Sequence, residues 1–449
     1  MFETLKNAWK IADLKKKLLF TLFIIVLYRL GTTIPVPFIN AAQFEGALAT
    51  SGSIFQYLNI MTGSAFAQAT LFALGINPYI TASIVIQLLC VAIPALERLA
   101  KEGEEGQKKI NQITRYVTVG LGLITAIGYY MLLKNYQVIV NPNFFKAVVI
   151  VSVYCAGSAL VMWLAEKVND KGIGNGISMI LFANIISRLP SFVGTIIDLV
   201  SGKYQYKVDD VTTKTVPFWL GIIIVVVAIA LAVAMIGFIV WMTNSERRLP
   251  VQYAKKVVGR KMYGGQSSNL PLKVNMVGVM PIIFASSIVS IFPTIKMFAY
   301  PNEAANLELY KSKFWYNVLS FFDSGKIPYI IITFLLLIAF AYFYTSISFN
   351  PVEVANNLKQ NGGTIMGIRP GRPTAEYITR ILNRVTLIGA ILLAVVDIIP
   401  MIINVCFGGN LSELAFGGSS IIIVVGVILE TVREIEAQMT MRNYKGFLN

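Results

Sequence analysis

The feature that most restricts this chain is a long stretch without charge. From residue 46 to residue 96 there is no Asp, Glu, Lys or Arg. One membrane-spanning helix needs only about 20 apolar residues, and the segment from Leu71 to Leu89 supplies them. Near its start lie Gly75 and Pro78, residue types that interrupt a helix. The stretch therefore predicts one interrupted span together with a second, shorter element.

Composition identifies the class of protein. Of the 449 residues, 56% are hydrophobic and 14% are charged, and the mean hydropathy is +0.67. So much apolar surface cannot be hidden in one soluble core, and we expect an all-α polytopic membrane protein. The chain has no histidine, which excludes histidine-based catalytic and metal sites. Cys90, Cys155 and Cys406 lie too far apart in the sequence to predict a metal site or a disulfide framework.

Ten apolar segments are long enough to cross a membrane. They are residues 18–36, 69–93, 114–133, 147–165, 176–197, 217–243, 276–295, 327–348, 381–402 and 416–432. Lys and Arg concentrate in loops that stay in the cytoplasm. With the N-terminus inside, the cytoplasmic segments hold 26 of the 38 Lys and Arg residues, the external segments hold nine and the spans hold three. The sequence therefore predicts ten spans with both termini in the cytoplasm.

This topology leaves room for only one full crossing between residues 46 and 96. The surplus, Ser53–Gln68, mixes apolar with small and polar residues at roughly helical spacing. We expect a short helix that dips in from the external side, where protein or a water-filled cavity must cover its polar backbone groups. The alternative is an amphipathic helix that lies flat on the outer surface.

Two halves of five spans would be inverted relative to each other, and two pairs of motifs support such a repeat. Gly75–Pro78 opens the second span of the first half, and Gly278–Pro281 opens the second span of the other half. The fifth spans begin alike, at Gly174–Ser178 and Gly417–Ile421. Inverted repeats with interrupted helices mark a pathway at the interface between the halves.

The midplane positions of the interrupted spans are alkyl rather than ionisable. A ring of such side chains would exclude ions by dewetting and still give way to a passing object; ordinary helix packing is the alternative. A solute transporter usually carries ionisable residues deep in its spans, whereas the few present here, such as Arg29 and Asp397, lie towards span ends. The alkyl positions are Ile76, Ile80, Ile177, Leu181, Ile283 and Ile423.

Six segments, in order along nearly the whole chain, carry a resemblance to a known family. They are GSAFAQATLFALGINPYITASIVIQLL (Gly63–Leu89), GIGNGIS (Gly172–Ser178), RRLPVQYAKK (Arg247–Lys256), QSSNLPLKVNMVGVMPIIFASSI (Gln266–Ile288), FNPVEVANNLK (Phe349–Lys359) and GIRPGRPT (Gly367–Thr374). These segments are similar to SecY, the channel subunits of bacterial protein translocases. The resemblance implies two five-helix halves, residues 18–200 and 217–437, clamped around an hourglass channel. The remaining segments are residues 1–17 and 438–449 in the cytoplasm and 201–216 outside.

The resemblance also implies roles for particular residues. The six alkyl positions become the pore ring at the waist of the channel, and a lateral gate lies between spans two and three on one side and seven and eight on the other. A polar chain continues across the membrane, whereas an apolar segment of about 20 residues leaves through the gate into lipid. The plug of the channel falls at about residues 53–65 and contains Ser53, Ile54, Phe55, Tyr57, Leu58, Ile60, Met61 and Gly63.

The energy for transport must come from a partner. The sequence contains no GxxxxGK[ST] phosphate-binding loop, and we expect no cofactor. Two cytoplasmic segments are basic and long for simple connections, residues 244–274 and 349–380. The alternative interpretation, that they only contact anionic lipid, explains their charge but not their length. Resemblance to SecY implies that they receive the SecA ATPase motor and the ribosome through Arg247, Arg248, Lys255, Lys256, Arg260, Lys261, Arg369 and Arg372.

The family further implies SecE-like and SecG-like membrane subunits, signal peptides and nascent secretory or membrane proteins as partners, in a bacterial plasma membrane. Two other classes of function stay open at this point. A solute transporter with inverted repeats would need a charged or polar substrate site. A membrane enzyme would need a hydroxyl nucleophile, since histidine and a credible carboxylate pair are missing.

Overall fold

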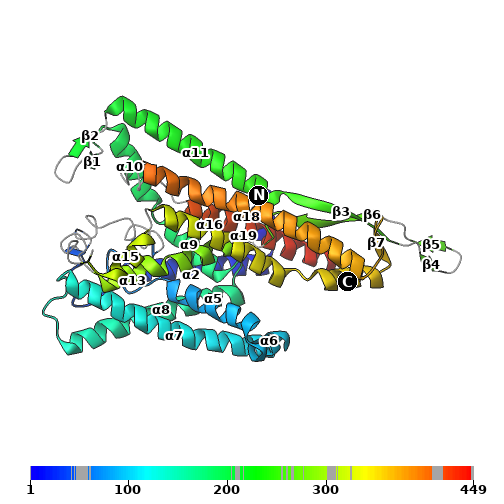
Figure 1. Ribbon diagram of the computed structural model, residues 1–449, viewed down its shortest axis with the longest axis horizontal. Coiled ribbons are helices and arrows are strands. Elements are labelled where there is room, and N and C mark those ends of the chain that lie inside the picture. The colour runs from blue at the N-terminus through cyan, green and yellow to red at the C-terminus, as the bar shows by residue number, and fades with distance from the viewer. Residues whose placement is uncertain are drawn as a thin grey trace.

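In the computed structural model the chain forms an elongated bundle of helices, most of which run along its long axis, with small strands projecting from one end (Figure 1). The structure describes residues 2–41, 43, 44, 46, 59, 62–203, 205–207, 213–215, 217–253, 256–258, 261–263, 267–276, 278–300, 310, 312–323, 326–406 and 418–445.

Each half of the chain supplies one set of helices. The first half contains α1 (Phe2–Lys10), α2 (Ala12–Gly31), α5 (Asn77–Ala92), α6 (Pro94–Lys101), α7 (Glu104–Asn135), α8 (Phe144–Lys171), α9 (Gly176–Ile186) and α10 (Leu189–Val200). A hairpin of β1 (Gln205–Lys207) and β2 (Thr213–Thr215) follows. The second half contains α11 (Phe218–Asn244), α12 (Met280–Val289), α13 (Ile291–Ala299), α15 (Phe314–Phe321), α16 (Ile327–Ser348), α17 (Pro351–Gln360), α18 (Arg372–Cys406) and α19 (Gly418–Lys445).

The described helices form seven apolar segments long enough to cross a membrane, or eight when the bent pair α5 and α6 counts as one span. The pairs α9 with α10 and α12 with α13 each make a single span. Helices α2 and α19 occupy the places expected for the first and tenth spans. They are not among the seven because each carries a cluster of charge, at Lys15–Lys17 in α2 and at Glu430–Glu434 in α19. The fold is a polytopic helical membrane protein, consistent with the ten predicted spans.

The loops assigned to the two sides of the membrane lie at opposite ends of the bundle. The C-terminal end of the chain and the strands of the long basic loops lie towards one end, whereas β1, β2 and α15 lie at the other, and the N-terminal end lies near the middle of the view (Figure 1). The distribution of Lys and Arg therefore separates the loops into two spatial groups, as a membrane requires.

The two Gly-Pro motifs of the expected repeat have the same local structure. Gly75 and Gly278 adopt φ values of +57° and +67°, a region open mainly to glycine. The next residues are helix N-caps with nearly equal backbone angles: φ −91° and ψ −4° at Ile76, and φ −92° and ψ −14° at Val279. Each following helix has proline in its first turn, where the missing N–H would be unpaired anyway. The match supports an inverted repeat.

The helix of the second span begins later than predicted. A span was expected over residues 69–93, but α5 starts at Asn77 and the chain bends by 101° into α6 at Pro94. The 16 residues of α5 reach about 24 Å, less than the roughly 30 Å of a hydrocarbon core. Residues 63–76 before it form turns. Hydropathy did not separate these turns from the helix because both are apolar.

Residues 63–76 are largely buried, so their backbone polar groups need partners inside the protein. Tyr129 of α7 donates a hydrogen bond to the carbonyl of Phe66 at 2.6 Å, and Tyr154 of α8 donates one to the carbonyl of Ala69 at 3.2 Å. Both tyrosines are fully buried. Two side chains from neighbouring helices thus complete the hydrogen bonding of an irregular segment.

The two long basic loops form small antiparallel sheets, which the sequence analysis did not predict. The strands are β3 (Glu246–Tyr253), β4 (Lys256–Val258), β5 (Lys261–Tyr263), β6 (Ser267–Lys273) and β7 (Gly363–Ile365), with β3 between β6 and β7 and with β4 paired to β5. Buried Leu249 and Val251 alternate with exposed residues along β3, the pattern of a half-buried strand. Pro250 and Pro271 lie within paired strands, and proline argues against a strand in a sequence.

The Tyr129→Phe variant should lose about 1–3 kcal/mol of stability, because it leaves the buried Phe66 carbonyl without its donor. Chemical unfolding of the purified protein in mixed micelles measures the loss. Tyr130→Phe is the matched control: Tyr130 is the next residue, is only partly buried, and should change stability by less than about 0.5 kcal/mol. Equal losses in the two variants would contradict this role of Tyr129.

Candidate functional site

The six alkyl side chains singled out in the sequence come together in one buried cluster. Their exposed fractions lie between 0% and 6%. They come from the start of α5, from α9, from α12 and from α19. These residues, called the alkyl ring below, are Ile76, Ile80, Ile177, Leu181, Ile283 and Ile423.

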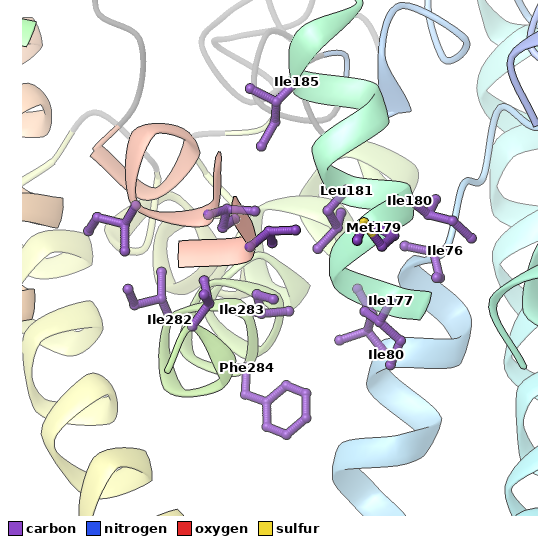
Figure 2. Packing of buried hydrophobic residues seen from close by; sticks show 14 of the residues in the cluster. Ile76, Ile80, Ile177, Met179, Ile180, Leu181, Ile185, Ile282, Ile283 and Phe284 are labelled. Atoms are coloured by element: carbon purple, nitrogen blue, oxygen red, sulfur yellow. The ribbon is translucent and has the colours of Figure 1, made fainter. Parts of the chain in front are cut away.

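The alkyl ring lies between the two halves of the chain. Figure 2 shows Ile177 and Leu181 of α9 on one side together with Ile76 and Ile80, and Ile283 of α12 on the opposite side. Alkyl side chains offer water no hydrogen bonds, so a constriction made of them excludes water and ions.

Polar contacts fix the first turn of α9. The side chain of Asn175 accepts hydrogen bonds from the backbone N–H groups of Ile177 and Ser178, the usual arrangement at a helix N-cap. The side chain of Asn169 accepts another from the N–H of Gly176 at 2.7 Å. This capping holds Ile177 at the end of α9 that reaches the alkyl ring.

The halves also meet along a line of contacts made by α5 and α7 with α12, α13 and α16. Helix α5 packs against α12, and α7 packs against α13. Tyr344 of α16 donates a hydrogen bond to Oε1 of Gln87 on α5 at 2.6 Å. Phe298 of α13 lies so close to Gly128 of α7 that a Cβ there would overlap the ring. These helices are the ones between which the resemblance to SecY implies a lateral gate.

Of the eight predicted plug residues, only Gly63 belongs to the part of the chain that the structure describes. Gly63 has a φ of +61°, and its carbonyl accepts a hydrogen bond from Arg29 of α2 at 3.5 Å. Arg29 and Ser187 leave little room for a Cβ at this position. The base of the predicted plug is therefore held against α2 and the end of α9. The other seven, Ser53, Ile54, Phe55, Tyr57, Leu58, Ile60 and Met61, lie outside the described residues.

The basic loops present exposed arginines at one end of the molecule. Arg248 lies 2.7 Å from the carboxylate of Glu246, and Arg372 lies 3.0 Å from that of Glu376. Exposed ion pairs of this kind contribute little stability, so the fold does not depend on these charges. The exposed arginines are Arg247, Arg248, Arg369 and Arg372. Of the other predicted docking residues, Lys256 and Lys261 lie in β4 and β5, and Lys255 and Arg260 lie outside the described residues.

The part of the chain that the structure describes offers no metal site built from acidic or cysteine side chains. No group of three or more Cys, Asp or Glu there could hold a metal ion. Asp397 of α18 is only 1% exposed, so it packs inside the protein and not at its surface.

Sequence reasoning missed the polar residues that join distant segments. Gln87, Tyr129 and Tyr344 read as parts of apolar spans, and their partners lie 63 to 257 positions away along the chain. Gln87 carries the only local signal, because an amide within a span needs a hydrogen-bond partner.

Comparison with known proteins agrees with this architecture. The family model described as SecY matches residues 70–432. The chain belongs to the SecY family. It is 42% identical to the protein translocase subunit SecY of Streptomyces coelicolor and 40% identical to that of Mycobacterium bovis, in each case over 100% of both chains.

Solved structures share the SecY-family fold at low sequence identity. A structure described as that of a protein conducting channel matches with a TM-score of 0.62 at 16% identity, over 95% of this chain and 92% of the other. Sec61 in the canine ribosome-channel complex matches with a TM-score of 0.60 at 16% identity, over the same shares of the two chains. The likeness therefore extends over nearly all of the bundle.

The Ile283→Asn variant should raise the ion conductance of the resting protein by roughly tenfold, because an amide brings hydrogen-bonding groups into a dry constriction. Current across a planar lipid bilayer containing the reconstituted protein measures the change. Ile283→Leu keeps the volume and the apolar character, and its conductance should stay at the wild-type level. An unchanged conductance in Ile283→Asn would show that the alkyl ring is not the barrier.

Proposed function

We propose that this SecY-family chain is the channel subunit through which unfolded secretory polypeptides cross the plasma membrane, and from which apolar segments pass sideways into the bilayer. The observation that carries the proposal is the alkyl ring, which lies buried at the junction of two halves.

The alkyl ring suits a channel that must seal against ions and admit a chain of any sequence. In the resting state the six side chains close on one another and leave no wetted path. During transport they surround the moving polypeptide, and because dispersion contacts are non-directional they form with every side chain that passes. A site built from charges or hydrogen bonds would instead select its substrate.

Apolar segments would leave between α5 and α7 on one side and α12, α13 and α16 on the other. Support comes from the packing of α5 against α12 and of α7 against α13, and from the hydrogen bond that Tyr344 donates to Gln87. A segment of about 20 apolar residues is stable in lipid, so it partitions out once this line opens. A polar segment stays in the channel and crosses.

We also propose that residues 53–63 form a plug on the external side of the alkyl ring. The bond from Arg29 to the Gly63 carbonyl supports a fixed base for such a plug. The two halves are assigned to residues 18–200 and 217–437 because the SecY family has two five-helix halves. Both termini are assigned to the cytoplasm because this orientation puts most Lys and Arg inside.

Force for transport would come from partners and not from an enzymatic activity of the chain itself. Exposed Arg247, Arg248, Arg369 and Arg372 are proposed to receive a SecA motor or a ribosome, whose RNA phosphates attract arginine. Among the solved structures with this fold, Sec61 occurs in a ribosome-channel complex and an Ssh1 complex is bound to the yeast 80S ribosome. SecE-like and SecG-like subunits would complete the assembly.

A cysteine at Ile80 should cross-link to a cysteine in a stalled secretory chain, because Ile80 belongs to the alkyl ring. The native Cys90, Cys155 and Cys406 are first replaced by serine, and the adduct is detected by gel electrophoresis. Ile150→Cys is the matched control, since Ile150 is also buried in the first half but belongs to a separate cluster. If no position of the alkyl ring cross-linked to the secretory chain, the proposed path would be wrong.

Charge reversal in Arg369→Glu should slow SecA-driven translocation by about tenfold or more, because a like charge then faces an acidic partner surface. Gly367 and Gly371 on either side have φ values of +77° and +99°, and the Arg369 carbonyl accepts a hydrogen bond from Thr374, so the turn is held in place. Protease protection of a precursor in proteoliposomes measures the rate.

Lys108→Glu is the control for Arg369→Glu, since it reverses an exposed charge in a shorter basic segment. Its rate should stay close to wild type. An equal loss in the two variants would point to a general effect of charge and count against docking at Arg369.

A further inference from the structure

Two glutamates on α19 accept hydrogen bonds from the segments that lead into the two opposing helices of the alkyl ring. Oε2 of Glu434 accepts from the backbone N–H of Gly174 at 2.8 Å. Oε1 of Glu430 accepts from the backbone N–H of Val279 at 3.3 Å. Residues four apart on a helix share one face, so both carboxylates extend from the same side of α19.

Both contacts depend on glycine. Gly174 has a φ of +85° and Gly278 a φ of +67°, which favour glycine over any other residue. A Cβ at Gly278 would overlap the Glu430 carboxylate. Val279 is the N-cap of α12, where unpaired N–H groups and the helix dipole favour a negative charge. The backbone is therefore shaped to receive the carboxylate.

Each hydrogen bond lies about one turn from a residue of the alkyl ring. Gly174 precedes Ile177 of α9 by three residues, and Val279 precedes Ile283 of α12 by four. Helix α19 carries Ile423 itself. One helix thus supplies part of the alkyl ring and holds the chain beside the first turns of α9 and α12.

Further bonds fix Glu434 and this end of α19. The side chain of Gln438 donates to Oε1 of Glu434 at 3.1 Å and accepts from Lys17 of α2 at 3.1 Å. Arg433 donates to the carbonyl of Thr243, at the end of α11, at 2.8 Å. Both oxygens of the Glu434 carboxylate are therefore engaged, and its position is set from several sides.

We propose that Glu430 and Glu434 are positioning residues that hold the alkyl ring shut by tying α9 and α12 to α19. Helix α9 belongs to the first half, whereas α12 and α19 belong to the second. The two bonds therefore act in series, from α9 through Glu434 to α19 and from α19 through Glu430 to α12. Loss of either bond breaks this polar connection from α9 to α12 and leaves only their apolar contacts. The inference rests on the proposed channel function.

The test uses the full chain with its membrane partners, reconstituted in planar bilayers without substrate. Glu434→Ala and Glu430→Ala should each raise the resting ion conductance about tenfold, the effect of losing one charge-assisted hydrogen bond from the closed state. The double variant should conduct no more than the leakier single variant, because the bonds act in series. Glu434→Gln keeps an acceptor oxygen and should restore most of the seal.

Glu436→Ala is the matched control, since Glu436 is an exposed glutamate on the same helix. It should stay sealed. The proposal fails if the single alanine variants stay sealed. It also fails if their effects multiply in the double variant, because independent losses of stability would then explain them, or if Glu436→Ala leaks equally.

A second measurement separates this inference from the channel function and from failed assembly. Spin labels at Lys171 and Lys273, both exposed and each shortly before one of the two helices, report the separation of the halves in nanodiscs. Glu434→Ala should broaden the distance distribution, whereas Glu436→Ala should leave it unchanged. A cross-link from Ile80→Cys together with an unbroadened distance distribution in Glu434→Ala would support the channel function and reject the positioning role of Glu434. A broadened distance distribution in Glu434→Ala without any cross-link from Ile80→Cys would support the positioning role of Glu434 and reject the channel function.

Discussion

The structure depends on the need to satisfy every backbone polar group that lies at membrane depth. Residues 63–76 are irregular and largely buried, and they persist because α7 and α8 bring hydroxyl donors to them. Tyr129 reaches the carbonyl of Phe66 and Tyr154 reaches that of Ala69. Once these carbonyls are paired, the chain can reach Ile76 without a helix and begin α5 only at Asn77. A helix that spanned the whole membrane here would begin near the membrane surface, so its N-terminus would not lie inside the protein.

The alkyl ring comes together because three helices begin inside the protein. Ile76 and Ile80 lie at the first turn of α5, Ile177 is the second residue of α9, and Ile283 lies in the first turn of α12. A glycine with positive φ shortly precedes each of the three helices. The glycine turns the chain before the helix begins, and the branched side chains of the first turns then meet between the halves. The proposed barrier to ions is thus a consequence of where these helices start.

The sequence was informative wherever the signal is local. Hydropathy located most spans, the charge distribution separated the loops into two groups, and the Gly-Pro motifs marked interrupted helices whose caps have matching backbone angles. It failed where the partner is distant or where one local rule opposes another. Pro250 and Pro271 concealed the strands β3 and β6. The carboxylate of Glu434 binds a backbone group 260 positions away, and no periodicity within α19 reveals such a pairing.

Apolar and polar contacts between the halves have different roles. Dispersion contacts in the alkyl ring have little directional preference, so many arrangements of α9 and α12 would exclude water almost equally well. Hydrogen bonds need defined distances and angles, and the bonds from Tyr344 to Gln87 and from Gly174 to Glu434 are each compatible with few arrangements. In the proposed channel the alkyl side chains therefore provide the seal, and these polar bonds select one closed geometry. Because the loss of these two bonds costs little compared with unpacking a core, the two halves of the proposed channel would part while each keeps its own fold.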